Sequence, residues 1–257
     1  MAIRVKTDGH IAGHKRKNRN IKMKNKIITA TEAAALIKDG SSVMVGGFMG
    51  NGSPAGLLDA MVERGVKDLT VLCNDGGFGP ALDKETGEEV AGPTGTGKLI
   101  KAHSVKKLIA THIGLNKQVA EQMNAGELEV TLIPQGSFAE MIRAGGNGLG
   151  GVITPTGVGT EIEDGEFTLQ KMNLGGKDYL LMAPLHADVA VLGGTIVDKK
   201  GNVFYRGTTK NFQQVMATAA DLVIVEAEKV VEVGELDPDY VMTPNIFVDY
   251  IVVGGDK

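Results

Sequence analysis

The amino-acid sequence predicts an α/β fold, an open and mostly parallel sheet with helices on both faces. Segments typical of buried strands alternate with amphipathic, helix-like segments through residue 145, as a parallel sheet with crossover helices requires. A loop with four glycines in seven residues joins the first of these strands to a helix that begins at Pro54. The length of 257 residues is enough for a full core and fits one layered domain.

The first half of the chain has the clearest local signals. Thr29 and Glu32 have the spacing of a capping box, so we expect a helix there, closed by Asp39 and Gly40. Pro54 in the first turn and Gly65 just past the last turn bound the next helix. The expected helices are 32–40, 54–65, 98–104, 116–126 and 137–145, and the expected strands are 42–47, 68–75, 106–113 and 128–134.

The second half is less regular. Residues 145–165 form a glycine-rich passage, and residues 185–205 resemble two strands joined through the turn DKKGN. No repeat of ~20 to 50 residues and no linker divides the chain into two domains. The remaining expected elements are a helix at 211–220 and late strands of the same sheet at 221–231 and 245–254.

The charge is concentrated at the N-terminus. Residues 1–26 carry nine basic side chains against one acid, which leaves 18 basic and 30 acidic residues, a net charge of −12, for the rest. A body this acidic is a poor nucleic-acid binder, although the basic head could serve as a binding arm. The head has no aromatic residue for stacking, so a cloning remnant or a start upstream of Met23 is favoured. We expect residues 1–22 to be a disordered extension and 23–257 to be the folded domain.

Membrane, secretory and metal-binding classes have no support in the sequence. No run approaches about 18 apolar residues, and the N-terminus has no apolar signal region, so we expect a cytoplasmic protein without a membrane partner. The single cysteine, Cys73, cannot form an internal disulfide and ends an apolar strand, where a core role is favoured. His103, His112 and His186 share no metal-ligand spacing, so no metal is expected.

Two glycine motifs resemble nucleotide-binding loops in the wrong context. Residues 92–99, GPTGTGKL, stop one residue short of a phosphate loop, because Leu99 stands where Ser or Thr would hold Mg²⁺ and no buried strand precedes them. Residues 146–151, GNGLGG, match G-x-G-x-x-G but follow a helix. A flexible loop is the simpler interpretation of the first, and a helix C-cap with close backbone packing is the simpler interpretation of the second.

A third motif stands in the right order of strand, turn and helix. Gly50, Gly52 and Ala55 spell G-x-G-x-x-A, and Asp75 follows about twenty residues later, which keeps a nicotinamide-dependent enzyme open as an alternative. The loop is too long for the tight turn that lays a pyrophosphate on a helix. It offers a row of unshielded N–H donors backed by a helix N-terminus, a nest that suits an anion or an oxyanion.

Residues 39–54, DGSSVMVGGFMGNGSP, resemble the signature of the family I CoA-transferases, in their A (alpha) subunit. Every fixed position of the pattern is filled: an acid and Gly, three apolar residues, Gly-Gly-Phe, Gly and Pro. The resemblance covers nearly everything from Met23 onward, implies a sheet of the CoA-transferase type, and is strongest to bacterial acetate, butyrate and acetoacetate CoA-transferases. It continues in order through NDGG (74–77), GTGKLI (95–100), PQGSFAEMIRAGGNGLGG (134–151), TPTGVGT (154–160), GTTKNF (207–212) and VIVEAE (223–228).

The resemblance implies a reaction and assigns its groups to two different subunits. A glutamate of the family's B subunit attacks an acyl-CoA thioester, giving a mixed anhydride and CoA thiolate, and a carboxylic acid later takes the CoA by the reverse path. Here the matching stretch is CNDGG, which puts Asn74 at the position of that glutamate, and Gln135 matches the glutamine beside the thioester oxygen. The chain should thus be silent without a B subunit, in a hetero-oligomer that takes CoA as substrate and has no permanent cofactor. The resemblance assigns CoA contact to Gly46, Gly47, Phe48, Met49, Gly50, Asn51 and Gly52.

A phosphosugar isomerase or a non-catalytic sensor on the same architecture is the alternative from another class. Asp75 could be a substitute carboxylate, but its place in a strand-end turn favours capping of the backbone. Glu226 and Glu228 could reach the site from a neighbouring strand, although capping or solvated roles are favoured. Residues 81–93 form a longer loop than the family pattern suggests, and we expect it to shape acyl selectivity.

Overall fold

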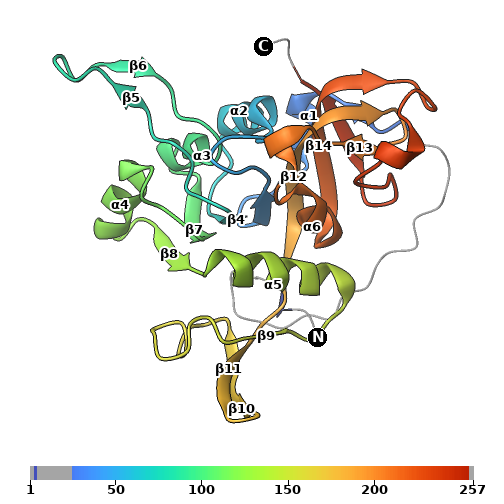
Figure 1. Cartoon of the computed structure of the whole chain (residues 1–257). Helices are drawn as coiled ribbons and strands as arrows, with labels where there is room; N and C mark the ends of the chain where they lie inside the picture. The colour runs from blue at the N-terminus through green and yellow to red at the C-terminus, as the bar shows by residue number, and fades with distance from the viewer. Residues whose placement is uncertain (1–2, 5–24, 255–257) are drawn as a thin grey trace.

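The central feature of the protein is a ten-stranded, mostly parallel sheet (Figure 1). The computed structural model describes residues 3–4 and 25–254. Neighbours along the main path of the sheet are all parallel, while β1 (Ile3–Arg4) joins β12 in parallel and β13 (Val203–Phe204) joins it antiparallel. The main path runs β2 (Ile27–Ile28), β15 (Tyr250–Val253), β14 (Ala220–Val231), β12 (Leu185–Asp198), β3 (Ser42–Val45), β4 (Leu69–Cys73), β7 (Val105–Ala110) and β8 (Glu129–Leu132).

Helices cover both faces of this sheet, and each face has its own apolar core. Successive residues of a strand point to opposite faces, so Val43 and Val45 pack with one helix group while Met44 packs with the other. One face carries α1 (Ala30–Ala35), α2 (Ala55–Arg64), α3 (Gly97–Lys101) and α4 (Lys117–Asn124). The other carries α5 (Gln135–Asn147) and α6 (Gln213–Thr218). The described residues also form two short 3-10 turns, η1 (Gly207–Thr209) and η2 (Pro238–Tyr240).

Several predicted boundaries are confirmed. Thr29 and Glu32 form both hydrogen bonds of the capping box at α1. Gly65 closes α2 in the left-handed region with φ 72°. The turn DKKGN joins β12 to β13 as an antiparallel pair. The predicted strand 245–254 is shorter than expected, since only Tyr250–Val253 pairs with the sheet.

Helix α5 is longer than predicted at both ends. It begins at Gln135 and runs through Gly145 and Gly146 to Asn147, before Gly148 caps it with φ 71°. A Cβ at Gly145 would overlap the carbonyl oxygen of Leu185, and one at Gly146 would overlap Thr218. These glycines therefore let the helix lie directly on neighbouring backbone, which confirms the close-packing interpretation of GNGLGG.

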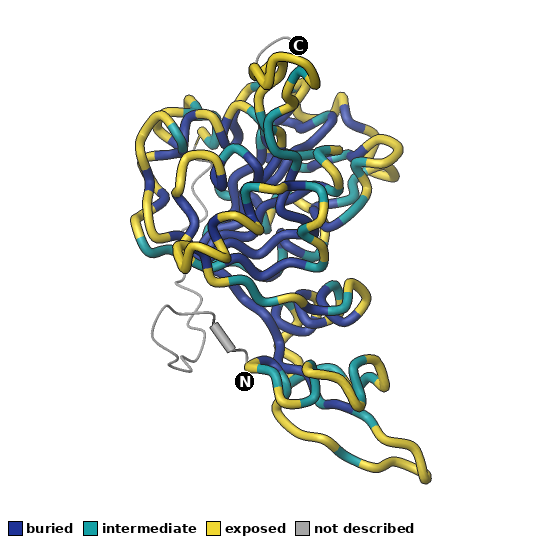
Figure 2. Tube along the Cα trace, turned by 90° about the vertical axis from the view of Figure 1, so that its left-hand side faces the viewer, coloured by how far each residue is buried: buried dark blue, intermediate teal, exposed yellow. Residues whose placement is uncertain are grey.

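A projecting arm, residues 152–182, was not predicted. It is a three-stranded antiparallel sheet of β9 (Val152–Thr154), β11 (Lys177–Met182) and β10 (Thr168–Leu174), which extends from the body below α5 (Figures 1 and 2). Much of β10 is exposed, and it carries polar residues on both faces, so it lacks the alternation that would mark a half-buried strand.

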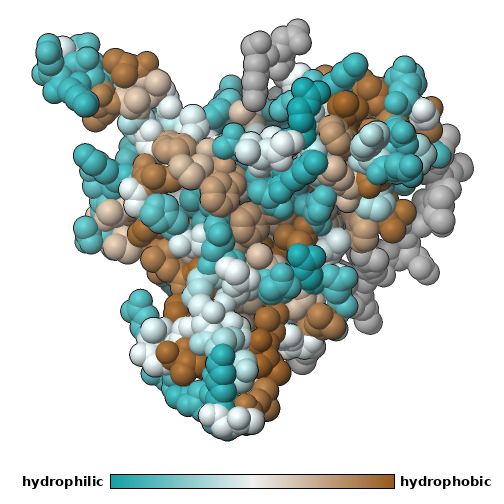
Figure 3. Space-filling model, in the orientation of Figure 1, coloured by the Kyte–Doolittle hydropathy of each residue, from teal (hydrophilic) through white to brown (hydrophobic). Residues whose placement is uncertain are grey.

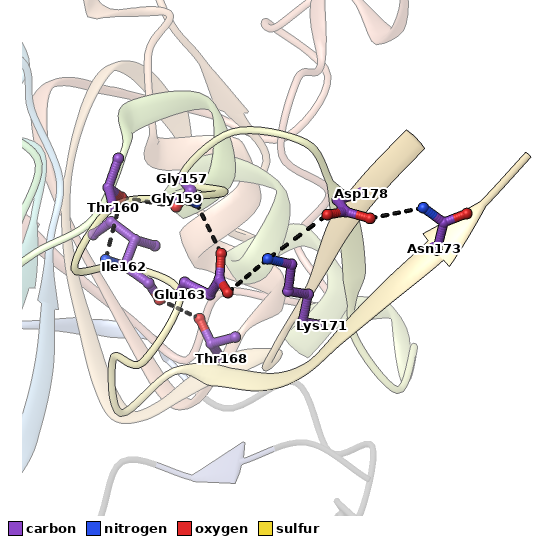
Figure 4. Close-up of polar contacts among 9 residues, drawn as sticks. All are labelled: Gly157, Gly159, Thr160, Ile162, Glu163, Thr168, Lys171, Asn173 and Asp178. Atoms are coloured by element: carbon purple, nitrogen blue, oxygen red, sulfur yellow. Dashed lines mark hydrogen bonds and ion pairs between the residues drawn. The ribbon is translucent and has the colours of Figure 1, made fainter. Parts of the chain in front are cut away.

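A network of ion pairs and hydrogen bonds joins the loop before β10 to strands β10 and β11 of the arm (Figure 4). The Lys171 ammonium lies 2.8 Å from the Glu163 carboxylate and 3.7 Å from that of Asp178. Glu163 also accepts a 2.8 Å hydrogen bond from the N–H of Gly159. Lys171 is the largest cause that holds the pKa of Glu163 below its usual range, and Glu163 in turn is the largest cause that raises the pKa of Lys171. This network holds the loop before β10 against the arm.

Residues 76–97 contain a second unpredicted projection. Strands β5 (Ala81–Leu82) and β6 (Glu89–Ala91) pair antiparallel and form the hairpin, residues 81–91, that extends at the upper left of Figures 1 and 3. Leu82 and Val90 are 56% and 65% exposed on it. Two hydrogen bonds between Phe78 and Thr94 close its base.

The predicted domain limits stay a prediction. Apart from β1, the expected extension 1–22 lies outside the described residues. Within residues 3–4 and 25–254, no helix is long and apolar enough to span a bilayer.

Candidate active site

The glycine loop, residues 46–52, folds back on itself at the carboxyl end of β3. Phe48 and Asn51 exchange two backbone hydrogen bonds of 3.1 and 2.9 Å across Met49 and Gly50. The central residues have φ values of 49° and 80°, the positive pair of a type I′ hairpin turn. The turn leaves the Met49 side chain 43% exposed at the tip of the loop.

Two of the glycines are required by the path of this loop. Gly47 and Gly52 have φ values of 124° and 79°, which side chains disfavour. A Cβ at Gly47 would overlap the Ser53 hydroxyl, and one at Gly52 would overlap the Gln213 amide. Side chains are therefore excluded at these two positions for two reasons: the backbone conformation disfavours them, and neighbouring atoms already fill the space that a Cβ would need.

The row of free N–H donors expected from the sequence is shorter than predicted. Gly46 donates to Val191 O over 2.9 Å, Phe48 and Asn51 bond each other, and Met49 donates to the Asp75 carboxylate over 2.8 Å. Among the described residues, no acceptor is found for the N–H groups of the other three loop residues. The donors that remain for a ligand are those of Gly47, Gly50 and Gly52.

Asn74 and Gln135, both assigned from the resemblance, are brought into direct contact. Gln135 is the first residue of α5, and its Nε2 donates to Asn74 Oδ1 over 2.6 Å. Asn74 lies at the end of β4 and is 3% exposed. Its Nδ2 donates to Asp75 Oδ2 over 2.7 Å, so the donors and acceptors around it fix the orientation of the amide.

Asp75 links these amides to the glycine loop. Its carboxylate accepts from Asn74 Nδ2, from Met49 N over 2.8 Å and from Gly77 N over 3.0 Å. These bonds confirm that Asp75 caps backbone, as expected for a strand-end turn. A continuous chain of hydrogen bonds thus runs from Gln135 through Asn74 and Asp75 to the turn of the glycine loop.

A small pocket lies between the glycine loop and this chain of hydrogen bonds. Gly95 and Thr96, from the segment that resembles a phosphate loop, form part of its wall. The pocket is lined by Val45, Gly46, Gly47, Gly50, Ser53, Cys73, Asn74, Asp75, Gly95 and Thr96. The two signals that looked unrelated in the sequence therefore meet in one place, at the carboxyl ends of β3 and β4.

A helix N-terminus follows the loop, as expected, but its N–H groups are not open to a ligand. Glu226 reaches across from β14 and accepts hydrogen bonds from Gly56 N over 3.1 Å and Leu57 N over 2.6 Å, at the start of α2. A carboxylate therefore already occupies the positive end of this helix. A pyrophosphate could not lie there without facing a like charge, which argues against the nicotinamide alternative. The capping role expected for Glu226 is confirmed.

Lys98 has a structural partner instead of a phosphate. Its ammonium lies 2.6 Å from the Asp59 carboxylate and donates to Ala55 O over 3.1 Å, both on α2. The helix that follows the glycines, α3, is only five residues long. The lysine of GPTGTGKL thus joins two helices, and the phosphate-loop interpretation stays rejected.

Cys73 is a core residue, as predicted. It is 2% exposed, and burial raises the pKa of its thiol to about 12. At neutral pH the thiol is therefore protonated and is no nucleophile. The described residues contain no group of three or more His, Cys, Asp or Glu side chains that could hold a metal ion.

Two residues of the site were not identified from the sequence. Asn211 Nδ2 donates to Asn51 O over 3.1 Å, and Gln213 Nε2 donates to Gly52 O over 2.9 Å. Asn211 belongs to the segment GTTKNF, which was among the stretches that resemble the family, and Gln213 follows it directly. The resemblance assigned no contact to this segment. Only the folded chain shows that it lies against the glycine loop.

Comparison with known proteins gives a consistent result. The family profile of the coenzyme A transferases matches residues 27–254. The chain is 45% identical over 235 residues to the acetate CoA-transferase subunit alpha of Escherichia coli strain K12, covering 91% of this chain and 100% of that one. It is 46% identical over 230 residues to the acetoacetyl-CoA:acetate/butyrate CoA transferase alpha subunit of Clostridium acetobutylicum, covering 90% and 98%.

Solved structures share the fold. An acyl-CoA transferase from Escherichia coli O157:H7, solved as a thioester complex with CoA, matches with a TM-score of 0.77 at 21% identity, covering 94% of this chain and 49% of that one. Glutaconate coenzyme A-transferase from Acidaminococcus fermentans matches with a TM-score of 0.74 at 20% identity, covering 89% and 75%. The predicted sheet type is thereby confirmed.

Proposed function

The chain belongs to the coenzyme A transferase family, as a subunit of the alpha type, and from this premise we propose that it forms half of the active site of a short-chain acyl-CoA:carboxylate CoA-transferase. Acetate, butyrate and acetoacetate are the acids in the names of its similar relatives. The other half is supplied by a beta-type partner subunit. A cytoplasmic location fits this metabolism and stays a prediction.

The observation that carries this proposal is the contact of Gln135 with Asn74, the residue at the position of the family's glutamate. An amide cannot attack a thioester to form an anhydride, because its nitrogen lone pair is delocalised and its oxygen is a poor nucleophile. Asn74 Oδ1 and Nδ2 are also both engaged in hydrogen bonds within the chain. The nucleophile must therefore come from the partner, whose glutamate would approach this end of the sheet.

In each step of the proposed reaction one bond to a carbonyl carbon forms and another breaks. The partner's carboxylate attacks the thioester carbonyl, the tetrahedral oxyanion collapses, and the C–S bond breaks to give an acyl-glutamyl anhydride and CoA thiolate. The thiolate then attacks the glutamyl carbonyl and releases the donor carboxylate, which leaves a glutamyl-CoA thioester. An acceptor carboxylate attacks this thioester, and the same steps in reverse give the new acyl-CoA.

The residues of this chain act on the oxyanions and on the position of CoA. Gly47, Gly50 and Gly52 offer backbone N–H groups to the CoA chain and to the developing negative charge. Gln135 uses one N–H of its amide on Asn74 and keeps the second for the thioester oxygen. Backbone donors are already aligned before the reaction and need no reorganisation, which is how such groups lower a barrier.

Reconstitution with a candidate beta subunit tests the proposal. The complex should transfer CoA from acetoacetyl-CoA to acetate or butyrate, whereas each subunit alone should be inactive. Hydroxylamine added during turnover should label a glutamate of the partner and no residue of this chain, as mass spectrometry would show. Turnover by this chain alone, with the partner shown to be absent, would overturn the proposal.

A further inference from the structure

Gln213 packs against the glycine loop from α6 and is not one of the groups assigned to the oxyanion or to CoA. It is the first residue of α6 and is 0% exposed. A Cβ at Gly46 would lie 3.4 Å from its amide carbon, and one at Gly52 would overlap its amide nitrogen. The side chain therefore fills the space between the two ends of the loop.

The amides of Asn211 and Gln213 hold the two peptide planes that flank Gly52. Asn211 Nδ2 donates to Asn51 O over 3.1 Å, and Gln213 Nε2 donates to Gly52 O over 2.9 Å. In a trans peptide the C=O and the N–H point in opposite directions. Fixing the Asn51 carbonyl thus points the N–H of Gly52 away from Asn211, and fixing the Gly52 carbonyl holds the next plane, which carries the N–H of Ser53.

The Gln213 amide is retained at a cost. Its Oε1 is buried and accepts no hydrogen bond from the described residues. A buried amide oxygen without a donor is unfavourable, and an apolar side chain of similar shape would avoid this cost. Among the described residues the Gln213 amide makes one hydrogen bond in return, from Nε2 to the backbone of the glycine loop.

We propose that Gln213 is a positioning residue for CoA transfer: it holds the peptide plane that follows Gly52, as Asn211 holds the plane that carries the Gly52 N–H, and the two planes together fix the direction of that donor. The inference rests on the proposed function, because it assigns the Gly52 N–H to the thioester or its oxyanion. Gly52 has no side chain that would restrain its backbone, and it holds a φ of 79°. Without this bond the donor would sample several directions, and misplacement by about 1 Å is enough to cost about 100-fold in rate.

The test uses the reconstituted complex and a matched pair of substitutions. Gln213→Met keeps the length of the side chain and removes the donor, and Gln214→Met makes the same change at the next, exposed position of α6. We expect Gln213→Met to lower kcat about 10- to 100-fold with a smaller change in KM, and Gln214→Met to leave both near wild type. Hydrogen exchange of residues 47–53 should be faster in Gln213→Met alone.

A second variant keeps the test decisive if Gln213→Met fails to fold. In Gln213→Glu the protonated carboxyl can donate to Gly52 O, whereas the carboxylate cannot. The activity of this variant relative to wild type should therefore rise as the pH falls. A flat ratio, or wild-type kinetics in a folded Gln213→Met, would overturn the inference. Loss of all transfer in the wild-type complex would instead reject the proposed function.

Discussion

The Nε2 of Gln135 lies 2.6 Å from the Oδ1 of Asn74, and this hydrogen bond joins the start of α5 to the end of β4. Two elements on different layers of the fold thus contribute one amide each to the same point at the edge of the sheet. The contact is also the first link in the chain that reaches the glycine loop through Asp75. A substitution of Gln135 should therefore lower kcat more than it lowers the free energy of unfolding.

Gln135→Met should lower kcat of the reconstituted complex by about 10²- to 10³-fold, the usual effect of removing one oxyanion donor. Because Gln135 is exposed, the free energy of unfolding should change by no more than about 0.5 kcal/mol. Gln170→Met, at an exposed position of the arm, is the matched control and should have normal kinetics. Wild-type kcat in Gln135→Met would remove this side chain from the reaction.

Glu226→Ala should destabilise the chain by about 1–2 kcal/mol, because Gly56 N and the N–H of the buried Leu57 would lose their acceptor at the start of α2. Urea unfolding followed by circular dichroism measures this loss. Glu228→Ala removes the same carboxylate two residues along β14, where it is exposed, and should leave the midpoint nearly unchanged. Equal losses in the two variants would show a general charge effect instead of a lost cap.

Local signals were enough to predict most of the fold. The capping box at Thr29 and Glu32 and the glycine that closes α2 act within a few residues of chain, so the sequence contains the whole interaction. The arm and the hairpin were missed because short, exposed strands with polar residues lack the apolar pattern of a buried strand. Their pairing depends on turns and cross-strand contacts that become visible only in the folded chain.

The sequence was enough to predict which residues form the candidate site, but not which hydrogen bonds they make. Gly46–Gly52, Asn74 and Gln135 were assigned from the resemblance, and the structure places them at one end of β3 and β4. Which loop N–H groups stay available depends on Val191 and Asp75, which approach from other strands. The occupation of the α2 N-terminus by Glu226 is likewise a contact across 169 positions of the chain. Motif spacing contains no information of that kind.

The Cys73 thiol should be unreactive in the folded chain. Its pKa of about 12 leaves almost no thiolate at pH 8, and the side chain is 2% exposed. A thiol-specific disulfide reagent should therefore label the chain in urea and not in buffer. Leu82→Cys in the exposed hairpin adds a control thiol that should react at once in the native chain. Rapid labelling of Cys73 in buffer would contradict its place in the core.

Shortening the hairpin should change acyl selectivity and leave stability intact. The hairpin starts at the Phe78–Thr94 contact, directly before the pocket-lining residues Gly95 and Thr96, and its own residues are almost all exposed. Replacement of residues 82–90 by a short glycine turn should alter the ratio of kcat/KM for acetate and butyrate in the complex. The double change Leu82→Ser and Val90→Ser separates apolar contact from length. Unchanged ratios in both would discard the role in selectivity.

The loop before β10 should separate from Lys171 at both extremes of pH, because the ion pair between Lys171 and Glu163 needs both side chains to be charged. The pKa of Glu163 is lowered, so its contribution is present above the ordinary glutamate pKa of about 4.3 and is lost as the pH falls through the lowered value. The pKa of Lys171 is raised, so its contribution is present below the ordinary lysine pKa of about 10.4 and is lost as the pH rises through the raised value. Hydrogen exchange of residues 159–171 should therefore be slowest, after correction for intrinsic rates, between these limits.

Lys171→Met separates this effect from general acid unfolding. At pH 7 the variant should show faster exchange in residues 159–171 and no change in the main sheet, because an exposed ion pair contributes little to global stability. Lys177→Met, on the same arm but without an ion pair to Glu163, should exchange as wild type does. At a pH below the lowered pKa of Glu163 the difference between Lys171→Met and wild type should vanish, since the Glu163 carboxylate, which joins Lys171 to the loop, is then protonated. A difference that persisted there would mean that Lys171 holds the loop through its contact with Asp178 or through the packing of its aliphatic stem, and not through Glu163.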